Sequence, residues 1–146
     1  MKNESISRFH GLLISSPDDW LDITDDLGQS FPPTLAKVDG IGALQFSVAQ
    51  YRCGPLPNPM PEDLLQLTLD VGKSRTMVEP FSKITEQTPI RLGAASFQVG
   101  ADFVRLWHVS GGANIVRITY TCDWGQEKTE LPTCERIVRS IGFEVI

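Results

Sequence analysis

The sequence predicts an α+β fold, in which helices pack on the faces of an antiparallel sheet to form an α/β/α sandwich. Residues 42–51 alternate apolar and polar side chains, as a half-buried strand does. Residues 88–124 contain three strand-like runs separated by glycine-containing turns, and a C-terminal helix follows this three-strand meander. Residues 62–72 and 131–141 repeat apolar side chains at helical spacing. Strands and helices mix without strict βαβ alternation, which favours antiparallel pairing.

The first third of the chain has few regular patterns. Residues 1–9 are polar, and we expect them to be loose. Residues 11–15 (GLLIS) form a short strand candidate, whereas the Asp, Pro and Gly of residues 16–33 predict a loop with one helical turn at most. In the strand predicted at 42–51, Leu44, Phe46 and Val48 share one face, and positions 45, 47 and 49 carry Gln, Ser and Ala on the other.

The stretch YRCGPLPNPMPEDL, residues 51–64, contains four prolines, at every second position from 55 to 61. Proline fixes φ and restricts the residue before it, so we expect a stiff, extended connector from strand to helix. Its last proline, Pro61, suits the first turn of the following helix, and Gly72 is a natural stop. A rigid connector loses little entropy on binding, so Leu56 and Met60 are secondary candidates for a partner surface.

The second half of the chain gives the clearest signals. In the run ending at Cys122, apolar side chains alternate with Arg117, Thr119 and Thr121. The run before it carries apolar residues on both faces, which predicts a sheet that is covered at least partly on both sides. The final helix has Pro132 in its first turn and arginines toward its end, where the helix dipole favours them.

Length and charge restrict the possible functions. A chain of 146 residues is the usual size of one domain, so we expect residues 1–146 to form a single domain. The formal net charge is -5, which argues against nucleic acid or an anionic membrane as the main partner. No signal segment or membrane span is recognisable, and the three cysteines have no paired spacing. We therefore expect a cytoplasmic protein with free thiols and, as partner, a basic protein surface.

Three segments resemble the PsbP-like α/β/α sandwich family. They are ISSPDDWLDIT near the start, NIVRITYTCDW in the meander and TCERIVRSIGFE in the last helix. The resemblance implies the sandwich fold and supplies no catalytic motif. Bacterial stand-alone members are mostly non-enzymatic, and compact acidic domains of this kind occur as immunity proteins beside secreted toxins. This chain lacks the lipoprotein or transit segment of many members, which puts an envelope or photosynthetic role in doubt.

The acidic run PDDWLDITDD has three interpretations. Its carboxylates can serve as turn and cap residues of a solvated loop. They can instead form a docking patch for a basic partner, with the aromatic residue as anchor. A calcium site is the weakest interpretation, because the spacing does not match an EF-hand loop. The residues of the docking hypothesis are Asp18, Asp19, Trp20, Asp22, Asp25 and Asp26.

No catalytic, metal or cofactor site can be assembled from the sequence. His108 lies beside apolar strand residues, so we expect a packed histidine, and Cys122 and Cys134 fit a core. Neither a Cys–His nucleophile signature nor zinc-like spacing is present. Arginines at 91, 105 and 117 either share an exposed sheet face or cover apolar surface with their stems.

These observations favour a non-enzymatic protein-binding module. Its expected role is that of an immunity protein that neutralises a cognate toxin by occlusion, with the acidic run covering a basic surface. The alternative is a small-ligand-binding or accessory domain with a pocket between sheet and helix. An uncovered sheet face would also permit a homodimer.

Overall fold

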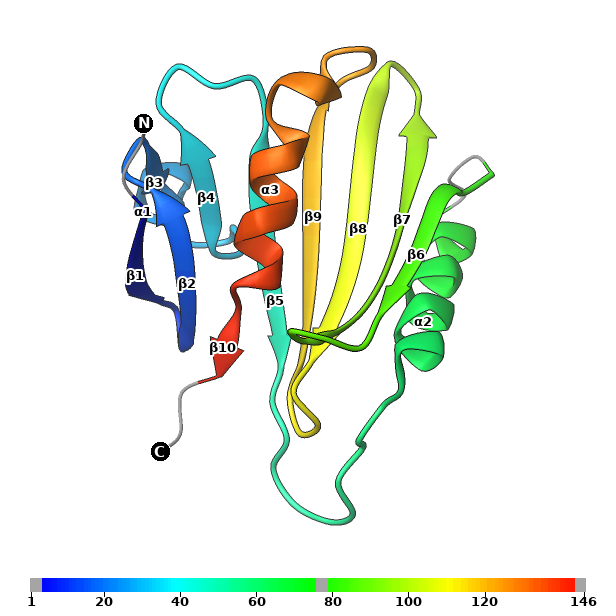
Figure 1. Cartoon of the computed structure of the whole chain (residues 1–146). Helices are drawn as coiled ribbons and strands as arrows, with labels where there is room; N and C mark the ends of the chain where they lie inside the picture. The colour runs from blue at the N-terminus through cyan, green and yellow to red at the C-terminus, as the bar shows by residue number, and fades with distance from the viewer. Residues whose placement is uncertain (1–3, 76–78, 144–146) are drawn as a thin grey trace.

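The computed structural model describes residues 4–75 and 79–143, which form two antiparallel sheets and helices on both faces of the larger sheet (Figure 1). The larger sheet has the strand order β3-β4-β5-β9-β8-β7-β6, and the smaller has β1-β2-β10. This confirms the predicted α+β sandwich. The strands of the larger sheet are β3 (Trp20–Asp22), β4 (Thr34–Lys37), β5 (Ala43–Ala49), β6 (Phe81–Glu86), β7 (Arg91–Val99), β8 (Asp102–Ser110) and β9 (Ile115–Asp123).

The smaller sheet corrects the expectation of a loose start. Residues 4–9, expected to be loose, form β1 (Glu4–Phe9), and this strand pairs with β2 (Leu12–Pro17). Residues 1–3 lie outside the described residues. His10 and Gly11 join the two strands with φ values of 49° and 88°, which are the values that a tight hairpin turn requires. The short β10 (Gly142–Phe143) pairs with the other edge of β2.

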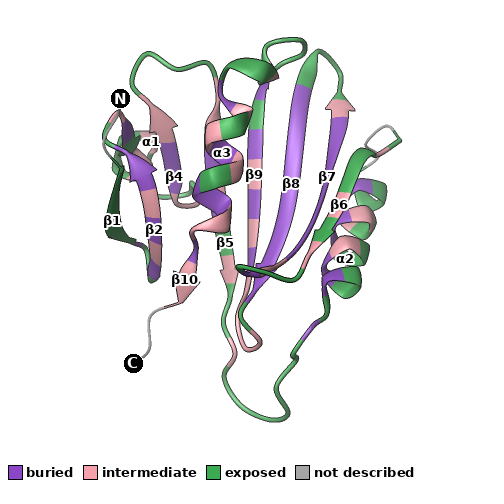
Figure 2. Ribbon diagram, viewed as in Figure 1, coloured by how far each residue is buried: buried purple, intermediate pink, exposed green. Residues whose placement is uncertain are grey.

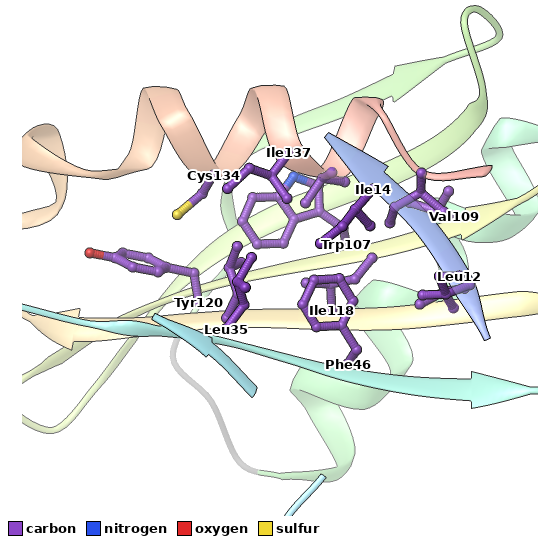
Figure 3. Close-up of a cluster of buried hydrophobic side chains, with 14 of the residues drawn as sticks. Leu12, Ile14, Leu35, Phe46, Trp107, Val109, Ile118, Tyr120, Cys134 and Ile137 are labelled. Carbon is purple, nitrogen blue, oxygen red and sulfur yellow. The ribbon is translucent and has the colours of Figure 1, made fainter. Parts of the chain in front are cut away.

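One face of the larger sheet is covered by α3 (Leu131–Arg139) and the smaller sheet. Alternate strand residues point to this face and meet Cys134 and Ile137 of α3 and Ile14 of β2 (Figure 3). Trp107 lies at the centre of the cluster and is fully buried. Its indole N–H donates to Glu135 of α3 at 3.1 Å. This hydrogen bond gives the indole nitrogen the partner that a buried polar atom needs.

The opposite face is covered only in part by α2 (Pro61–Ser74), which packs on β6, β7 and β8. Strand β8 is buried along nearly its whole length, in agreement with the predicted two-sided cover (Figure 2). On β5 and β9, by contrast, residues facing α3 are buried and several residues of the other face are partly or fully exposed. The larger sheet is therefore a sandwich on the β6–β8 side and open on the β3–β5 and β9 side.

Two glycines permit the close contact of α2 with the sheet. A Cβ on Gly93 would lie 2.1 Å from the backbone nitrogen of Leu65, and a Cβ on Gly72 would lie 2.4 Å from the Phe97 ring. Gly72 was expected to end the helix, but it is buried inside α2, which continues to Ser74. The missing side chain of Gly72 serves packing and not termination.

The proline stretch is the predicted connector between β5 and α2. Asn58 N–H donates to the Gly112 carbonyl at 2.8 Å, and Tyr51 N–H donates to Asn114 at 2.7 Å, so both ends of the connector are attached to the β8–β9 loop. That loop has four residues, between Ser110 and Ile115. Met60 N–H donates to Asp63 at 2.9 Å where α2 begins.

The Asp-rich segment contains the one helical turn that the sequence allowed, α1 (Thr24–Leu27), and also the strand β3, which was expected to be loop. Strand β4 follows it. A single 3-10 turn, η1 (Glu127–Thr129), precedes α3. No helix among the described residues is both long and apolar enough to cross a lipid bilayer.

Substituting Gly93 with Ala should lower the free energy of unfolding by about 2–3 kcal/mol, because the added methyl overlaps the backbone of α2. Urea unfolding followed by circular dichroism measures this loss. Gly100 is the matched control: nothing lies within 4 Å of its added Cβ, so Gly100→Ala meets only the strain of its positive φ. Equal small losses in both variants would show that α2 does not depend on this contact.

Candidate functional site

Trp20 cannot serve as the exposed anchor of an acidic docking patch. Its side chain is 5% exposed and belongs to the core under α3 and the smaller sheet. The alternation of β3 places Trp20 on the inner face and the next residue, Leu21, on the opposite face, where it is 49% exposed. Leu21 is therefore the apolar side chain that this strand offers to a partner.

Asp22 and Asp19 of the run have contacts within the fold. Asp22 Oδ2 lies 2.8 Å from His10 Nε2, and Asp22 also accepts from Thr24. Partial burial tends to raise the pKa of Asp22, but the hydrogen bonds from Thr24 and His10 outweigh it and leave that pKa below its usual range. Asp19 lies 3.9 Å from Lys37. Asp22 thus connects the end of β3 to the turn between β1 and β2, and Asp19, just before β3, lies near Lys37 of β4.

The grouping of His10, Asp22 and Thr24 is not that of a catalytic triad. In a triad the two ring nitrogens of histidine serve different partners. Here the same nitrogen, Nε2, faces both the Asp22 carboxylate and the Thr24 hydroxyl. The arrangement orients a turn and provides no path for a proton from hydroxyl to carboxylate through the ring.

The remaining carboxylates, Asp18, Asp25 and Asp26, are exposed near the β3 end of the larger sheet, and Asp18 accepts a hydrogen bond from Ser5 of β1 at 3.3 Å. We call these three residues, together with the exposed Leu21 and Val38, the acidic edge. Leu21 pairs with Ala36, two positions from Val38, so these two half-exposed apolar side chains share one face of the β3–β4 ladder. The acidic edge thus combines apolar area with negative charge.

Leu56 and Met60 are exposed but belong to another part of the molecule. Leu56 is 62% exposed in the connector between β5 and α2. This connector extends below the sheet in Figure 1, whereas α1 and β3 lie at its far edge. The structure therefore does not bring Leu56 and Met60 together with the carboxylates.

The small-ligand alternative expected a pocket between sheet and helix without naming its residues, and a groove lies on the uncovered half of the sheet, beside α2. One cavity of about 300 Å³ is lined by Pro32, Gln45, Phe46, Ser47, Arg75, Arg117 and Thr119. A second, of about 320 Å³, is lined by Ser47, Val48, Ala49, Leu67, His108, Ile115 and Arg117. Because Ser47 and Arg117 line both cavities, the two are parts of one groove, which we call the β5–β9 groove.

A chain of hydrogen bonds positions Arg117 in this groove. Arg117 Nε donates to His108 Nε2 at 3.0 Å, so His108 must carry its proton on Nδ1. His108 Nδ1 lies 2.8 Å from the hydroxyl of Thr68 on α2, which in turn donates to the Leu64 carbonyl at 3.1 Å. Burial, and then the charge of Arg117, lower the pKa of His108 to about 4. The histidine is packed, as the sequence indicated, and its low pKa keeps it neutral near pH 7.

Arg117 is a partly buried cation with a like charge nearby. Burial, and then the positive charge of Arg75, lower the pKa of its guanidinium. Among residues 4–75 and 79–143, no carboxylate forms an ion pair with Arg117. Its charge is therefore not neutralised within the part of the chain that the structure describes.

The strand arginines do not gather on one face. Arg105 points toward α3, where its Nε donates to Glu135 at 3.1 Å, and it is almost fully buried. Arg117 points to the opposite face, and Arg91 donates to Asn58 and Pro59 of the connector. Arg105 and Arg91 therefore have hydrogen-bond partners within the fold.

The thiols and carboxylates form no evident reactive centre in the described residues. Burial raises the pKa of both Cys122 and Cys134, so neither thiol ionises readily. Cys53 is exposed in the connector. No three His, Cys, Asp or Glu side chains within the described ranges lie close enough to hold a metal ion.

No protein-family model and no curated protein matches the chain. Solved structures share its fold. CyanoP, the cyanobacterial PsbP of Synechocystis sp. PCC 6803, matches with a TM-score of 0.64 and 7% identity over 99% of this chain and 94% of its own. A protein of Bacteroides thetaiotaomicron VPI-5482 matches with a TM-score of 0.63 and 15% identity over 99% of this chain. This chain spans 49% of that protein's length. The fold is PsbP-like, as the resemblance implied, and these identities show the fold alone.

His108 should make the stability of the fold depend on pH. Its pKa of about 4 lies below the usual 6.5, so between these values the unfolded chain binds a proton that the folded chain excludes. The stabilising contribution is complete above pH 6.5 and is lost as the pH falls toward 4. We expect a loss of about 2 kcal/mol between pH 7 and pH 5 from this residue.

Urea unfolding at the two pH values measures this loss. His108→Gln keeps an amide acceptor and donor but cannot titrate, so its stability should change less over the same interval. His10→Gln removes the other histidine and should leave the His108 contribution in place. An unchanged pH dependence in His108→Gln would assign the effect to other groups.

Proposed function

We propose that this chain is a non-enzymatic protein-binding module that uses the acidic edge to cover a basic surface of a partner protein. The supporting observation is the combination of exposed carboxylates with half-exposed apolar side chains at one end of the sheet. Interfaces gain affinity from buried apolar area, while complementary charge accelerates association and rejects wrong partners. The net charge of -5 acts in the same direction.

The specific role that we propose is a cytoplasmic immunity protein that neutralises a cognate bacterial toxin by occlusion. Such a protein needs a stable fold and a complementary surface, and it needs no catalytic group. The grouping of His10, Asp22 and Thr24 lacks triad geometry, and the two buried thiols are poorly ionised. The acidic edge would lie on the basic substrate-binding surface of a toxin, as a nuclease or another polyanion-binding enzyme presents.

The double variant Asp25→Asn/Asp26→Asn should weaken association with the partner about tenfold at low salt and by less at high salt. Both side chains are exposed on the single turn of α1. The matched control is Asp102→Asn/Asp123→Asn, which removes two exposed carboxylates that face each other on β8 and β9. The control should bind like the unchanged protein.

The partner is to be identified by capture from the native cell at low salt, followed by mass spectrometry, and the affinities by biolayer interferometry. Growth rescue against a toxin, where one is encoded beside this protein, tests the specific role. A Leu21→Ser variant, which leaves every charge in place, should also lose affinity. If the chain elutes alone at all salt concentrations, or only as a homodimer, and rescues no growth, the proposal is wrong.

A further inference from the structure

The β5–β9 groove differs chemically from the acidic edge. At its centre Arg117 lies opposite Ser47 in the β5–β9 register, on the half of the sheet that α2 leaves open. A guanidinium that is partly removed from water is costly unless charge or hydrogen bonds compensate it. His108 is neutral, so it accepts a hydrogen bond from Arg117 without neutralising the charge.

A second arginine increases this cost. Arg75 lies at the end of α2 and lines the same cavity as Arg117. The remaining polar lining comes from Gln45, Ser47 and Thr119, whose side chains are hydrogen-bond donors. Two guanidinium groups and neutral donors around one cavity, in a chain of net charge -5, match the chemistry that holds a carboxylate or phosphate.

The other part of the groove is apolar. The cavity that shares Ser47 and Arg117 is lined by Ala49, Leu67 and Ile115, and by Val48, whose side chain packs on the core of the opposite face. Arg117 therefore stands between a region rich in polar donors and a region of aliphatic side chains. This order of surfaces suits a ligand with an anionic group at one end and a short apolar body at the other.

We propose that the β5–β9 groove binds a small amphiphilic anion, with its carboxylate on Arg117 in the part of the groove that Arg75 also lines and its apolar chain along Leu67, Ala49 and Ile115. The neutral His108 is a positioning residue. It holds Arg117 by Nε and leaves the two terminal nitrogens of the guanidinium to form a bidentate pair with a carboxylate. This site is separate from the acidic edge and gives the small-ligand alternative a location and a ligand class.

Octanoate is the probe, titrated into the full chain and followed by amide chemical shifts in two-dimensional NMR. We expect saturable shifts at Ser47, Arg117 and Ile115 with a dissociation constant of about 0.1–1 mM. Octan-1-ol has the same chain without the charge, octylammonium reverses the charge, and inorganic phosphate supplies an anion alone. All three should bind at least about tenfold more weakly. Equal binding of octanol or phosphate, or no shifts with octanoate, overturns the proposal.

Variants test the assigned contacts. Arg117→Gln should weaken octanoate binding at least about tenfold, because it removes a charge-assisted hydrogen bond. Arg117→Lys keeps the charge but cannot form a bidentate pair, so its affinity for octanoate should lie between those of the unchanged chain and Arg117→Gln. The matched control is Arg136→Gln on α3, whose side chain is 61% exposed and covers the other face. It should bind octanoate as the unchanged chain does.

Two further variants separate this proposal from loss of fold and from the acidic edge. Leu67→Ser should weaken octanoate but leave the weak phosphate binding unchanged, since Leu67 lines the apolar part only. Asp25→Asn/Asp26→Asn should leave octanoate binding unchanged. Spectra of β7 and β8 amides report whether each variant is folded. A folded Arg117→Gln variant with full affinity for octanoate contradicts the assignment.

Discussion

The contact of α2 with the sheet at Gly93 is the constraint on which the other features depend. Because Gly93 has no side chain, the backbone of α2 at Leu64 and Leu65 lies directly on β7. This distance brings the Thr68 hydroxyl within 2.8 Å of His108, and His108 within 3.0 Å of Arg117. Displacing α2 by the size of one methyl group would break this series of hydrogen bonds at the contact between Thr68 and His108. Packing at one glycine thus fixes both the tautomer of a histidine and the direction of an arginine.

The lateral position of α2 also explains why the sheet has two kinds of surface. The helix covers β6, β7 and β8, so β8 is buried on both sides and carries its polar groups only where they have partners. Arg105 is the clearest case, since it donates to Glu135, Ser96 and the Ser82 carbonyl. On β9, one strand away, Arg117 meets the edge of the helix and no carboxylate among the described residues. The two arginines differ because alternation sends them to opposite faces, and only one face is fully covered.

Most of the fold was predictable because its strongest signals are local. Alternation identified β5 and the meander, and apolar spacing identified α2 and α3. Strands β1, β3, β4 and β6 were missed, because each is short or lies near an edge, where burial leaves little pattern. Trp20 shows most clearly the limit of prediction from local sequence. Its acidic neighbours suggested an exposed side chain, but adjacent residues of a strand point to opposite faces, and Trp20 is buried. The β5–β9 groove needed a non-local fact, namely which strands α2 covers. The only local hint was the polar face shared by Gln45, Ser47, Arg117 and Thr119.

The acidic edge and the β5–β9 groove are linked through the face on which they lie. Pairing of Leu21 with Ala36 and of Ser47 with Arg117 places Leu21 and Arg117 on the same side of the larger sheet. They are separated by three strand spacings across the sheet, about 14 Å, and by four residues along the strands, about 13 Å. A partner of ordinary interface size that covers Leu21 therefore extends over the groove or reaches its rim. If both proposed sites bind their ligands, the two binding events would influence each other, and linkage requires that effect to be reciprocal. A partner that inserts a carboxylate at Arg117 would compete with octanoate, whereas one that only closes the groove would strengthen its binding.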